Sequence, residues 1–293
     1  MKTAVFIKRI AIRVVLYGAI LFLVFVWIFS GVLLHAYRPK YSGIPAVFKI
    51  PFEKITFTTK DNVLVYGWWT TGKTKEKCII LCHGLGADKS DMLNYMPFLY
   101  KKGYSLLAFD FRGHGESKEK YTSLGYNETK DLIAAVDFAK AKGAKHIGVI
   151  GRSMGAAVSI RTAELSPEIK AVVADSSFAC LPDMIKSYAR RLYHLPYFPM
   201  VPVTVYISEL RSGFKYETVN PVESAAKMKT PLLLIHGLED GNISPDNSRK
   251  IFEAAGGPKK LVLVKGADHV ESLSADQAGY SKEVLAFFGE YLK

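Results

Sequence analysis

Residues 146–165 read HIGVIGRSMGAAVSIRTAEL and give the clearest indication of the fold. Its first five residues form a short apolar run typical of a buried strand, and the residues from Met154 onward have helical spacing. Between them, GRSMG (151–155) fits the pattern GxSxG. At a tight turn from strand to helix, the two glycines remove side chains that would collide there, and the serine is held above the sheet. The stretch predicts such a turn with Ser153 as a candidate nucleophile; a turn of small residues without catalysis is the alternative.

Further short apolar runs follow the same rhythm along the chain. Near-continuous apolarity is what a parallel strand covered on both faces requires. Amphipathic stretches separate the runs, and we expect helices to begin near Asn127, Pro245 and Ser274. The alternation predicts an α/β fold with a mostly parallel sheet flanked by helices. The strand candidates are Cys78–Cys82, Ser105–Phe109, His146–Ile150, Ala171–Ala174, Leu232–Ile235 and Leu261–Val264.

Two segments depart from this rhythm. Residues 54–72 (KITFTTKDNVLVYGWWTTG) contain two β-rich stretches around the turn residues Lys60, Asp61 and Asn62, which predicts an opening hairpin. About 55 residues separate the strand ending at Asp175 from the next one, far more than a usual crossover. We expect an inserted helical cap at about 178–218. Its centre, YARRLYHLPYFPMVPV, either lines an apolar pocket or packs the insertion.

A serine hydroxyl needs a hydrogen-bonded base to take its proton. Of the seven histidines, His269 in KGADHVES follows the last expected strand, at the sheet edge where Ser153 lies. His236, His83 and His114 occupy strand ends or glycine-rich turns, where each is expected to serve as a hydrogen-bonding residue of the turn. The remaining histidines read as interface, strand and cap residues: His35, His146 and His194. The chain order favours His269 as the base.

A carboxylate must hold that base in the correct tautomer. Asp240 follows an expected strand in HGLEDGNIS and gives the chain order Ser, Asp, His that is typical of α/β-hydrolases. Glu239 and Asp268 are the neighbouring alternatives, and Asp175 closes the preceding strand. Backbone N–H groups must also face the developing oxyanion. The amide of Met154 is one candidate donor, and the amide of Leu85, in the glycine turn HGLGADKS, is the second.

Taken in order, HGLGADKS, DFRGHGES, GRSMG, LLLIHGLED and GADH give the chain from Phe52 to Lys293 a specific resemblance. It resembles the α/β-hydrolase superfamily, and within it bacterial membrane-anchored hydrolases similar to serine aminopeptidases and monoacylglycerol lipases. The resemblance implies a catalytic triad of Ser153, Asp240 and His269 with oxyanion donors at Leu85 and Met154. It assigns no catalysis to Arg112 and His114. Gly241 and Asn242 depart from the common pattern, which predicts a looser loop after Asp240.

An uncharged segment, Val14–Leu34, precedes this region. As a helix it would be about 31 Å long at roughly 1.5 Å per residue, enough to span a bilayer. The cations before it outnumber Arg38 and Lys40 beyond it, so we expect residues 1–37 to form a single-pass anchor with a cytoplasmic N-terminus. Residues 38–293 would form the hydrolase domain outside the cytoplasm. A cleaved signal peptide and a buried soluble helix are the alternatives. The preceding cations are Lys2, Lys8, Arg9 and Arg13.

The composition is that of an ordinary globular protein: 293 residues, 49% of them apolar and 23% charged. Disordered, collagenous and disulfide-stapled classes are therefore excluded. A net charge of +12 favours anionic surfaces without choosing among them. Because the charge is scattered and no recognised module appears, nucleic-acid binding is disfavoured. Cys78, Cys82 and Cys180 read as structural thiols without disulfide or metal-ligand spacing.

These observations predict a membrane-anchored serine hydrolase that cleaves carboxylic esters, lipid-like ones included, through an acyl-enzyme on Ser153. The chemistry needs no metal and no organic cofactor. A peptidase, thioesterase or acyltransferase of the same fold is the first alternative, and a non-catalytic envelope protein is the second. The sequence leaves the oligomeric state open.

Overall fold

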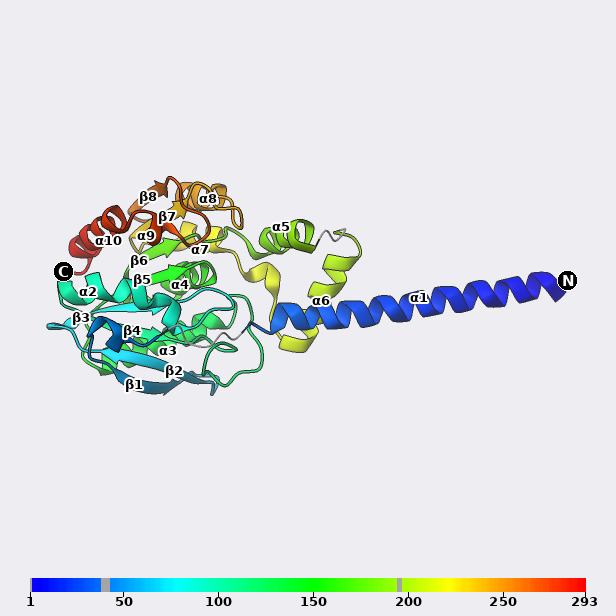
Figure 1. Ribbon diagram of the computed structural model, residues 1–293, viewed down its shortest axis with the longest axis horizontal. Coiled ribbons are helices and arrows are strands. Elements are labelled where there is room, and N and C mark those ends of the chain that lie inside the picture. Colours follow the sequence, from blue (N-terminus) through cyan, green and yellow to red (C-terminus); the bar gives the residue numbers. More distant parts are fainter. Residues whose placement is uncertain (1, 38–42, 194–196) are drawn as a thin grey trace.

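The computed structural model describes residues 2–37, 43–193 and 197–293, in which helices pack around a β-sheet and one long helix projects outward (Figure 1). Arg38, Lys40 and His194 lie outside the described residues. An eight-stranded sheet runs through the body in the order β1-β2-β4-β3-β5-β6-β7-β8. The strands are β1 (Glu53–Thr58), β2 (Leu64–Thr70), β3 (Thr74–Cys82), β4 (Tyr104–Phe109), β5 (His146–Arg152), β6 (Ile169–Asp175), β7 (Leu232–Gly237) and β8 (Lys259–Val264).

Strands β1 and β2 form the expected antiparallel hairpin, and β2 also pairs antiparallel with β4. Every pairing from β4 through β3 to β8 is parallel. All six apolar runs are confirmed as strands, each within an element somewhat longer than the run itself. Parallel strands end at one edge of the sheet, so the loops after β3, β5, β7 and β8 meet there.

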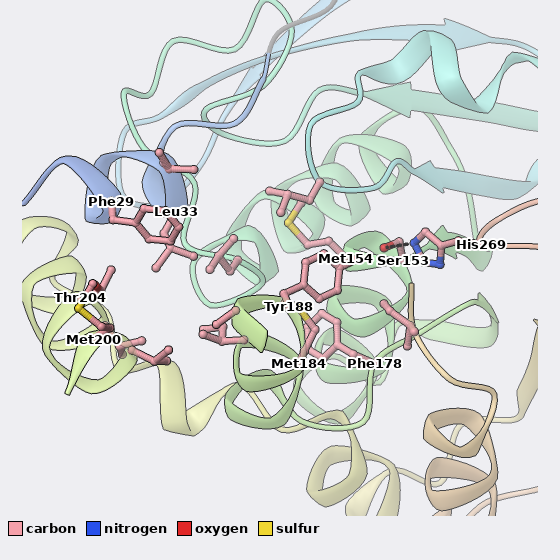
Figure 2. Close-up of a pocket in the computed structure, with 18 residues that line it drawn as sticks. Phe29, Leu33, Ser153, Met154, Phe178, Met184, Tyr188, Met200, Thr204 and His269 are labelled. Atoms are coloured by element: carbon pink, nitrogen blue, oxygen red, sulfur yellow. Dashed lines mark hydrogen bonds between the residues drawn. The ribbon is translucent and has the colours of Figure 1, made fainter. Parts of the chain in front are cut away.

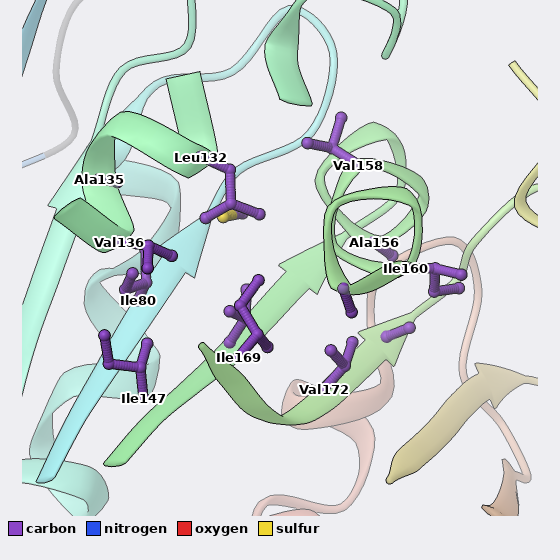
Figure 3. Packing of buried hydrophobic residues seen from close by; sticks show 14 of the residues in the cluster. Ile80, Leu132, Ala135, Val136, Ile147, Ala156, Val158, Ile160, Ile169 and Val172 are labelled. Atoms are coloured by element: carbon purple, nitrogen blue, oxygen red, sulfur yellow. The ribbon is translucent and has the colours of Figure 1, made fainter. Parts of the chain in front are cut away.

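Helices cover both faces of the sheet. One face carries α3 (Glu128–Ala141), α4 (Met154–Leu165), α7 (Pro221–Lys227) and α8 (Asp246–Ala254). The other carries α2 (Met96–Lys102) and α10 (Gln277–Tyr291), together with the 3-10 helix η2 (Lys89–Tyr95). Figure 3 shows the first face, where Leu132 and Val136 of α3 and Ile160 of α4 pack over Ile80 and Val172 of the sheet.

Neighbouring strand residues contribute to opposite faces, which explains why the runs are apolar throughout. Ile80 of β3 packs under α3 and α4, whereas its neighbours Ile79 and Leu81 pack under α2 and α10. Helices begin after Asn127 and Pro245 as expected. The expected start near Ser274 is wrong: Ser274 lies inside the short helix α9 (Ser272–Ala275), and α10 begins at Gln277. There the Asp276 side chain accepts a hydrogen bond from the Gly279 amide and caps the helix.

Two helices within the inserted stretch, α5 (Leu181–Tyr193) and α6 (Met200–Ser212), form a cap over the carboxyl edge of the sheet. The long N-terminal helix α1 (Lys2–Leu34) passes beside α6 and then projects away from the body (Figure 1). Its Ala4–Leu34 segment is long and apolar enough to cross a membrane, and only 6% of its most apolar window is buried. The last residue of α1, Leu34, is fully buried in the apolar cluster beneath the cap.

Candidate active site

Ser153 lies at a sharp turn between β5 and α4. Its backbone has φ 52° and ψ −115°, a region that residues other than glycine seldom adopt. The Ser153 amide donates to the carbonyl of Asp175 at 2.8 Å, which fixes the turn to the neighbouring strand β6. A Cβ at Gly151 would collide with the Gly155 backbone, and a Cβ at Gly155 would collide with the carbonyls of Cys82 and His83. Both glycines of the motif are therefore needed for the close approach of helix and strands.

The structure brings Ser153, His269 and Asp240 together at the carboxyl edge of the sheet. The Ser153 Oγ lies 3.0 Å from Nε2 of His269, and Nδ1 of the same ring lies 2.8 Å from Oδ2 of Asp240. Since a carboxylate only accepts, Nδ1 carries the proton and Nε2 is free to accept from the serine hydroxyl. The three side chains come from the loops after β5, β7 and β8. This arrangement can activate the hydroxyl as a nucleophile.

The Asp240 carboxylate is held on both oxygens. Its Oδ1 accepts from the amides of Asn242 and Ile243, each at 2.8 Å, and its Oδ2 lies 3.1 Å from Nε2 of His236. Burial acts to raise the pKa of Asp240, but the hydrogen bonds from His236 and His269 outweigh it and hold the pKa well below its usual range. The carboxylate is therefore ionised at neutral pH.

The looser loop expected from Gly241 and Asn242 is not what the structure shows. The Gly241 amide donates to the carboxylate of Asp268 at 2.9 Å, and the next amide donates to Asp240. Two backbone donors thus tie the loop to two carboxylates, which is the physical reason that the departure in sequence leaves the site ordered.

The alternative acids have other partners. Glu239 accepts from the amide of Gly266 at 2.7 Å, and Asp268 accepts from the amides of Gly241 and His269. Asp175 is fully buried, accepts from Ser176 and Ser272, and has a pKa raised by that burial. Within the described residues, none of the three carboxylates contacts the ring of His269. Their hydrogen bonds stabilise loops around the site instead.

The other described histidines also serve the structure. Nε2 of His83 accepts from the amide of Phe111 at 3.0 Å, and Nδ1 of His114 lies 2.8 Å from the carbonyl of Arg112. His35 packs edge-on against Tyr121, and His146 begins β5. The contact between His236 and Asp240 was missed by sequence reasoning. The only signal for it is the position of His236 at the end of a strand, four residues before the acid.

The segment 110–117 (DFRGHGES) forms buried ion pairs beside the site. Lys89 Nζ lies 2.6 Å from Oδ2 of Asp110, and both side chains are almost fully buried. Arg112 donates to Asp131 from Nε and Nη2 and to Asp61 from Nη1. These contacts give the segment a role in the packing of the loops, in line with the absence of a catalytic assignment for Arg112 and His114.

The candidate oxyanion donors flank Ser153. Met154 is the first residue of α4, so its amide has no partner within that helix. Gly84 passes so close to the serine that a Cβ there would lie 3.4 Å from Cβ of Ser153, and Leu85 follows it in the same turn. The carbonyl of Gly84 is held by Nδ1 of His83 at 2.7 Å. Both backbone segments thus border the space in front of the nucleophile.

An apolar pocket of about 320 Å³ leads away from the Ser153–His269 pair (Figure 2). This volume lies at the lower end of the range for small-molecule sites. Tyr188, Met200 and Val201 line it. Of the two interpretations of the segment YARRLYHLPYFPMVPV, these residues favour the one in which it lines an apolar pocket. Among the described residues that line the pocket, none is Asp or Glu. The cap contributes Met184, Ile185, Tyr188, Ala189, Met200, Val201, Thr204 and Val205, and α1 contributes Phe29, Val32 and Leu33.

No cluster of three or more His, Cys, Asp or Glu side chains is arranged to hold a metal ion within the described ranges. Cys78 and Cys82 are buried free thiols in β3, and burial raises the pKa of both well above the usual range. Such thiols pack as small apolar residues.

Comparisons with known proteins agree with this fold. The model of the prolyl oligopeptidase family (Peptidase_S9) matches residues 91–293. The uncharacterized protein YqkD of Bacillus subtilis (strain 168) is 32% identical over 214 residues, 71% of this chain and 70% of that protein. The uncharacterized protein YfhR of Escherichia coli (strain K12) is 28% identical over 246 residues, 80% of each chain. Among solved structures, the esterase Pf2001 of Pyrococcus furiosus superposes with a TM-score of 0.75 and 28% identity, covering 89% of this chain and 99% of that one.

The expected α/β-hydrolase superfamily and fold are therefore confirmed. The parallel sheet, the elbow at its carboxyl edge and the family match over the greater part of the chain agree with one another. The chain is a serine hydrolase that belongs to the prolyl oligopeptidase family.

Proposed function

We propose that this protein is a membrane-anchored hydrolase that cleaves carboxylic esters through an acyl-enzyme on Ser153. The observation that carries the proposal is the unbroken hydrogen-bond chain from Ser153 through His269 to Asp240. The likeness to an esterase at 28% identity supports the reaction class. A small acyl ester or a lipid-like one is the expected substrate.

In this mechanism the Ser153 hydroxyl gives its proton to Nε2 of His269 as Oγ attacks the ester carbonyl carbon. The amides of Leu85 and Met154 stabilise the resulting oxyanion, each contributing about 3–4 kcal/mol. His269 then protonates the leaving alcohol, and the C–O bond breaks to leave the acyl-enzyme. A water molecule gives a proton to His269 and attacks the acyl carbon, and the carboxylic acid leaves as Ser153 regains its proton. Asp240 stabilises the charged imidazole throughout.

The lining of the pocket favours esters over peptides. A peptidase that recognises a substrate amine needs an acidic group to pair with it, and the lining of this pocket, as far as the structure describes it, contains no acidic side chain. The family contains peptidases by name, so amide hydrolysis is the second candidate. Purified full-length protein should hydrolyse p-nitrophenyl octanoate much faster than leucine p-nitroanilide. Faster turnover of the anilide would contradict the preference for esters.

The proposed anchor is α1, with the N-terminus in the cytoplasm and the hydrolase domain outside it. The contacts of α1 support retention of the helix: the Thr122 amide donates to the carbonyl of Leu34 at 2.9 Å, and Arg211 donates to the carbonyl of Trp27 at 2.9 Å. Cleavage as a signal peptide would remove both contacts. We expect the full-length mass in the membrane fraction, resistant to alkaline carbonate. Recovery of a soluble protein that lacks α1 would contradict the anchor.

A further inference from the structure

The distal wall of the pocket is built by the helix proposed as the anchor. Figure 2 shows Phe29 and Leu33 of α1 at the end of the pocket opposite Ser153 and His269, with Tyr188 between them. Met200 of α6 lies at the same end of the pocket, across from Phe29 and Leu33. The space in which an acyl chain would lie therefore belongs jointly to the cap and to α1.

The end of α1 is fixed to the cap, with Val26, Ser30 and Leu34 fully buried at helical spacing. Arg211 of α6 donates to the Trp27 carbonyl and to Ser30 Oγ, and its guanidinium lies over the Trp27 ring, 4.4 Å from the ring centroid. The stretch Val26–Leu34 is thus part of the folded hydrolase as well as part of the apolar segment.

Because Val26–Leu34 belongs both to the folded domain and to the apolar segment, the depth of this stretch determines where the cap lies relative to the bilayer. The uncharged segment Val14–Leu34 is about 31 Å long as a helix, close to the roughly 30 Å hydrocarbon thickness. If Val26–Leu34 lay wholly outside the membrane, Val14–Phe25 would span only about 18 Å. The remainder would have to come from the segment that carries Lys8, Arg9 and Arg13, whose charges are disfavoured in hydrocarbon. The less costly arrangement leaves part of Val26–Leu34, and the cap bound to it, in the outer leaflet.

The surface of the cap fits that placement. Tyr206 and Leu210 of α6 are 60% and 68% exposed, and Phe198 at the turn before α6 is 78% exposed. Tyr206 and Leu210 lie one helical turn apart on α6, so these two large side chains are exposed on the same face of the helix, where they suit contact with lipid. Exposed basic residues of α5, Lys186 and Arg190, suit contact with lipid headgroups.

From these contacts we propose that the cap lies in the outer leaflet and that the pocket takes the acyl chain of a lipid ester directly from the bilayer. Phe29 and Leu33 of the anchor limit the length of the chain that fits. This inference rests on the proposed esterase activity and on the proposed anchor, and it adds the source of the substrate and the part that sets its chain length.

The test of the shared pocket uses full-length protein in phosphatidylcholine vesicles and the ratio of p-nitrophenyl palmitate to p-nitrophenyl butyrate hydrolysis. Leu33→Trp fills the distal end and should lower this ratio at least tenfold. Phe29→Ala opens that end and should raise it. Ile28→Trp is the matched control, since Ile28 is 62% exposed and does not line the pocket. An unchanged ratio in both pocket variants would overturn the proposal, and Phe29→Ala decides if Leu33→Trp does not fold.

The test of the leaflet position uses Leu210→Asp, with Leu165→Asp as its control on an exposed site of α4. The first variant should lower hydrolysis of the vesicle-embedded palmitate relative to soluble butyrate at least fivefold, and the control should leave the ratio as in the wild type. Equal ratios in the two variants would contradict contact between the cap and the leaflet. Failure of the wild type to hydrolyse butyrate would instead overturn the proposed esterase function.

Discussion

The ring of His236 lies against the carboxylate of Asp240, with Nε2 3.1 Å from Oδ2. The same nitrogen lies 2.8 Å from the carbonyl of Ile243, and Nδ1 lies 2.7 Å from the hydroxyl of Ser248. Two acceptors at Nε2 and one hydroxyl at Nδ1 assign the proton to Nε2. His236 therefore donates to the carboxylate that orients His269, which makes it a positioning residue.

Replacing His236 by Phe should lower kcat by about 10- to 100-fold, because a hydrogen bond to a charged group contributes about 1.5–3 kcal/mol. Loss of this donor also raises the pKa of Asp240. Ser248→Ala removes only the contact at Nδ1 and should cost less. A wild-type kcat in His236→Phe would contradict the positioning role.

Asp240→Asn should lower kcat by about 10⁴-fold, because an amide at this position stabilises the wrong tautomer of the His269 ring and no longer stabilises its charged form. Steady-state hydrolysis of a p-nitrophenyl ester measures the loss. Asp268→Asn is the matched control, since within the described residues the Asp268 carboxylate accepts from backbone amides and does not contact that ring. Comparable losses in the two variants would argue against Asp240 as the orienting acid.

The buried ion pair of Lys89 and Asp110 should matter for stability. Lys89→Met leaves Asp110 buried without its cation and should lower the free energy of unfolding by about 3–5 kcal/mol. Lys145→Met removes an exposed pair with Glu76, which solvent screens, and should lower the unfolding midpoint far less. Urea unfolding in detergent compares them. Similar midpoints for the two variants would count against the buried pair.

Two helical glycines should respond oppositely to alanine. Gly155→Ala places a Cβ against the Cys82 and His83 carbonyls and should destabilise the protein by about 1–3 kcal/mol or more, with loss of activity. Gly289 of α10 has open space around it, and Gly289→Ala should stabilise the helix by about 0.5–1 kcal/mol. Thermal unfolding measures both, and a stabilised Gly155→Ala would refute the close packing of the elbow.

The contact of Asp61 with Arg112 should make stability dependent on pH. Hydrogen bonds from Arg112 hold the pKa of Asp61 well below its usual range of about 4. A carboxyl whose pKa falls on folding stabilises the protein above its unfolded pKa, and this contribution is lost as the pH falls. Asp61→Asn should therefore reduce the unfolding midpoint more at pH 7 than at pH 3. An equal or larger reduction at pH 3 would contradict a pKa of Asp61 that falls on folding.

The features carried by local pattern were predictable from the sequence. Short apolar runs located six strands because both faces of this sheet are covered, and GRSMG located the elbow because only glycine allows that approach. Ser153, Asp240 and His269 could be brought together by topology alone, since each follows a parallel strand.

Features that depend on contacts between distant residues were not predictable. The burial of Lys89 and the packing of α1 on α6 arise only when segments far apart in the chain meet, and hydropathy does not encode such pairs. The helix start near Ser274 was wrong because the capping side chain of Asp276 lies two residues later. The loop after Asp240 was expected to be loose because sequence does not show which backbone amides find a carboxylate.

The role of Ser153 as nucleophile is tested by labelling the full-length protein with a fluorophosphonate, followed by mass mapping of the modified peptide. The proposed mechanism predicts one stoichiometric adduct on Ser153, none in Ser153→Ala, and a loss of ester hydrolysis in that variant of roughly 10⁴-fold or more. An unlabelled wild type, an adduct on another serine, or a Ser153→Ala protein that still hydrolyses p-nitrophenyl esters at the wild-type rate would contradict it.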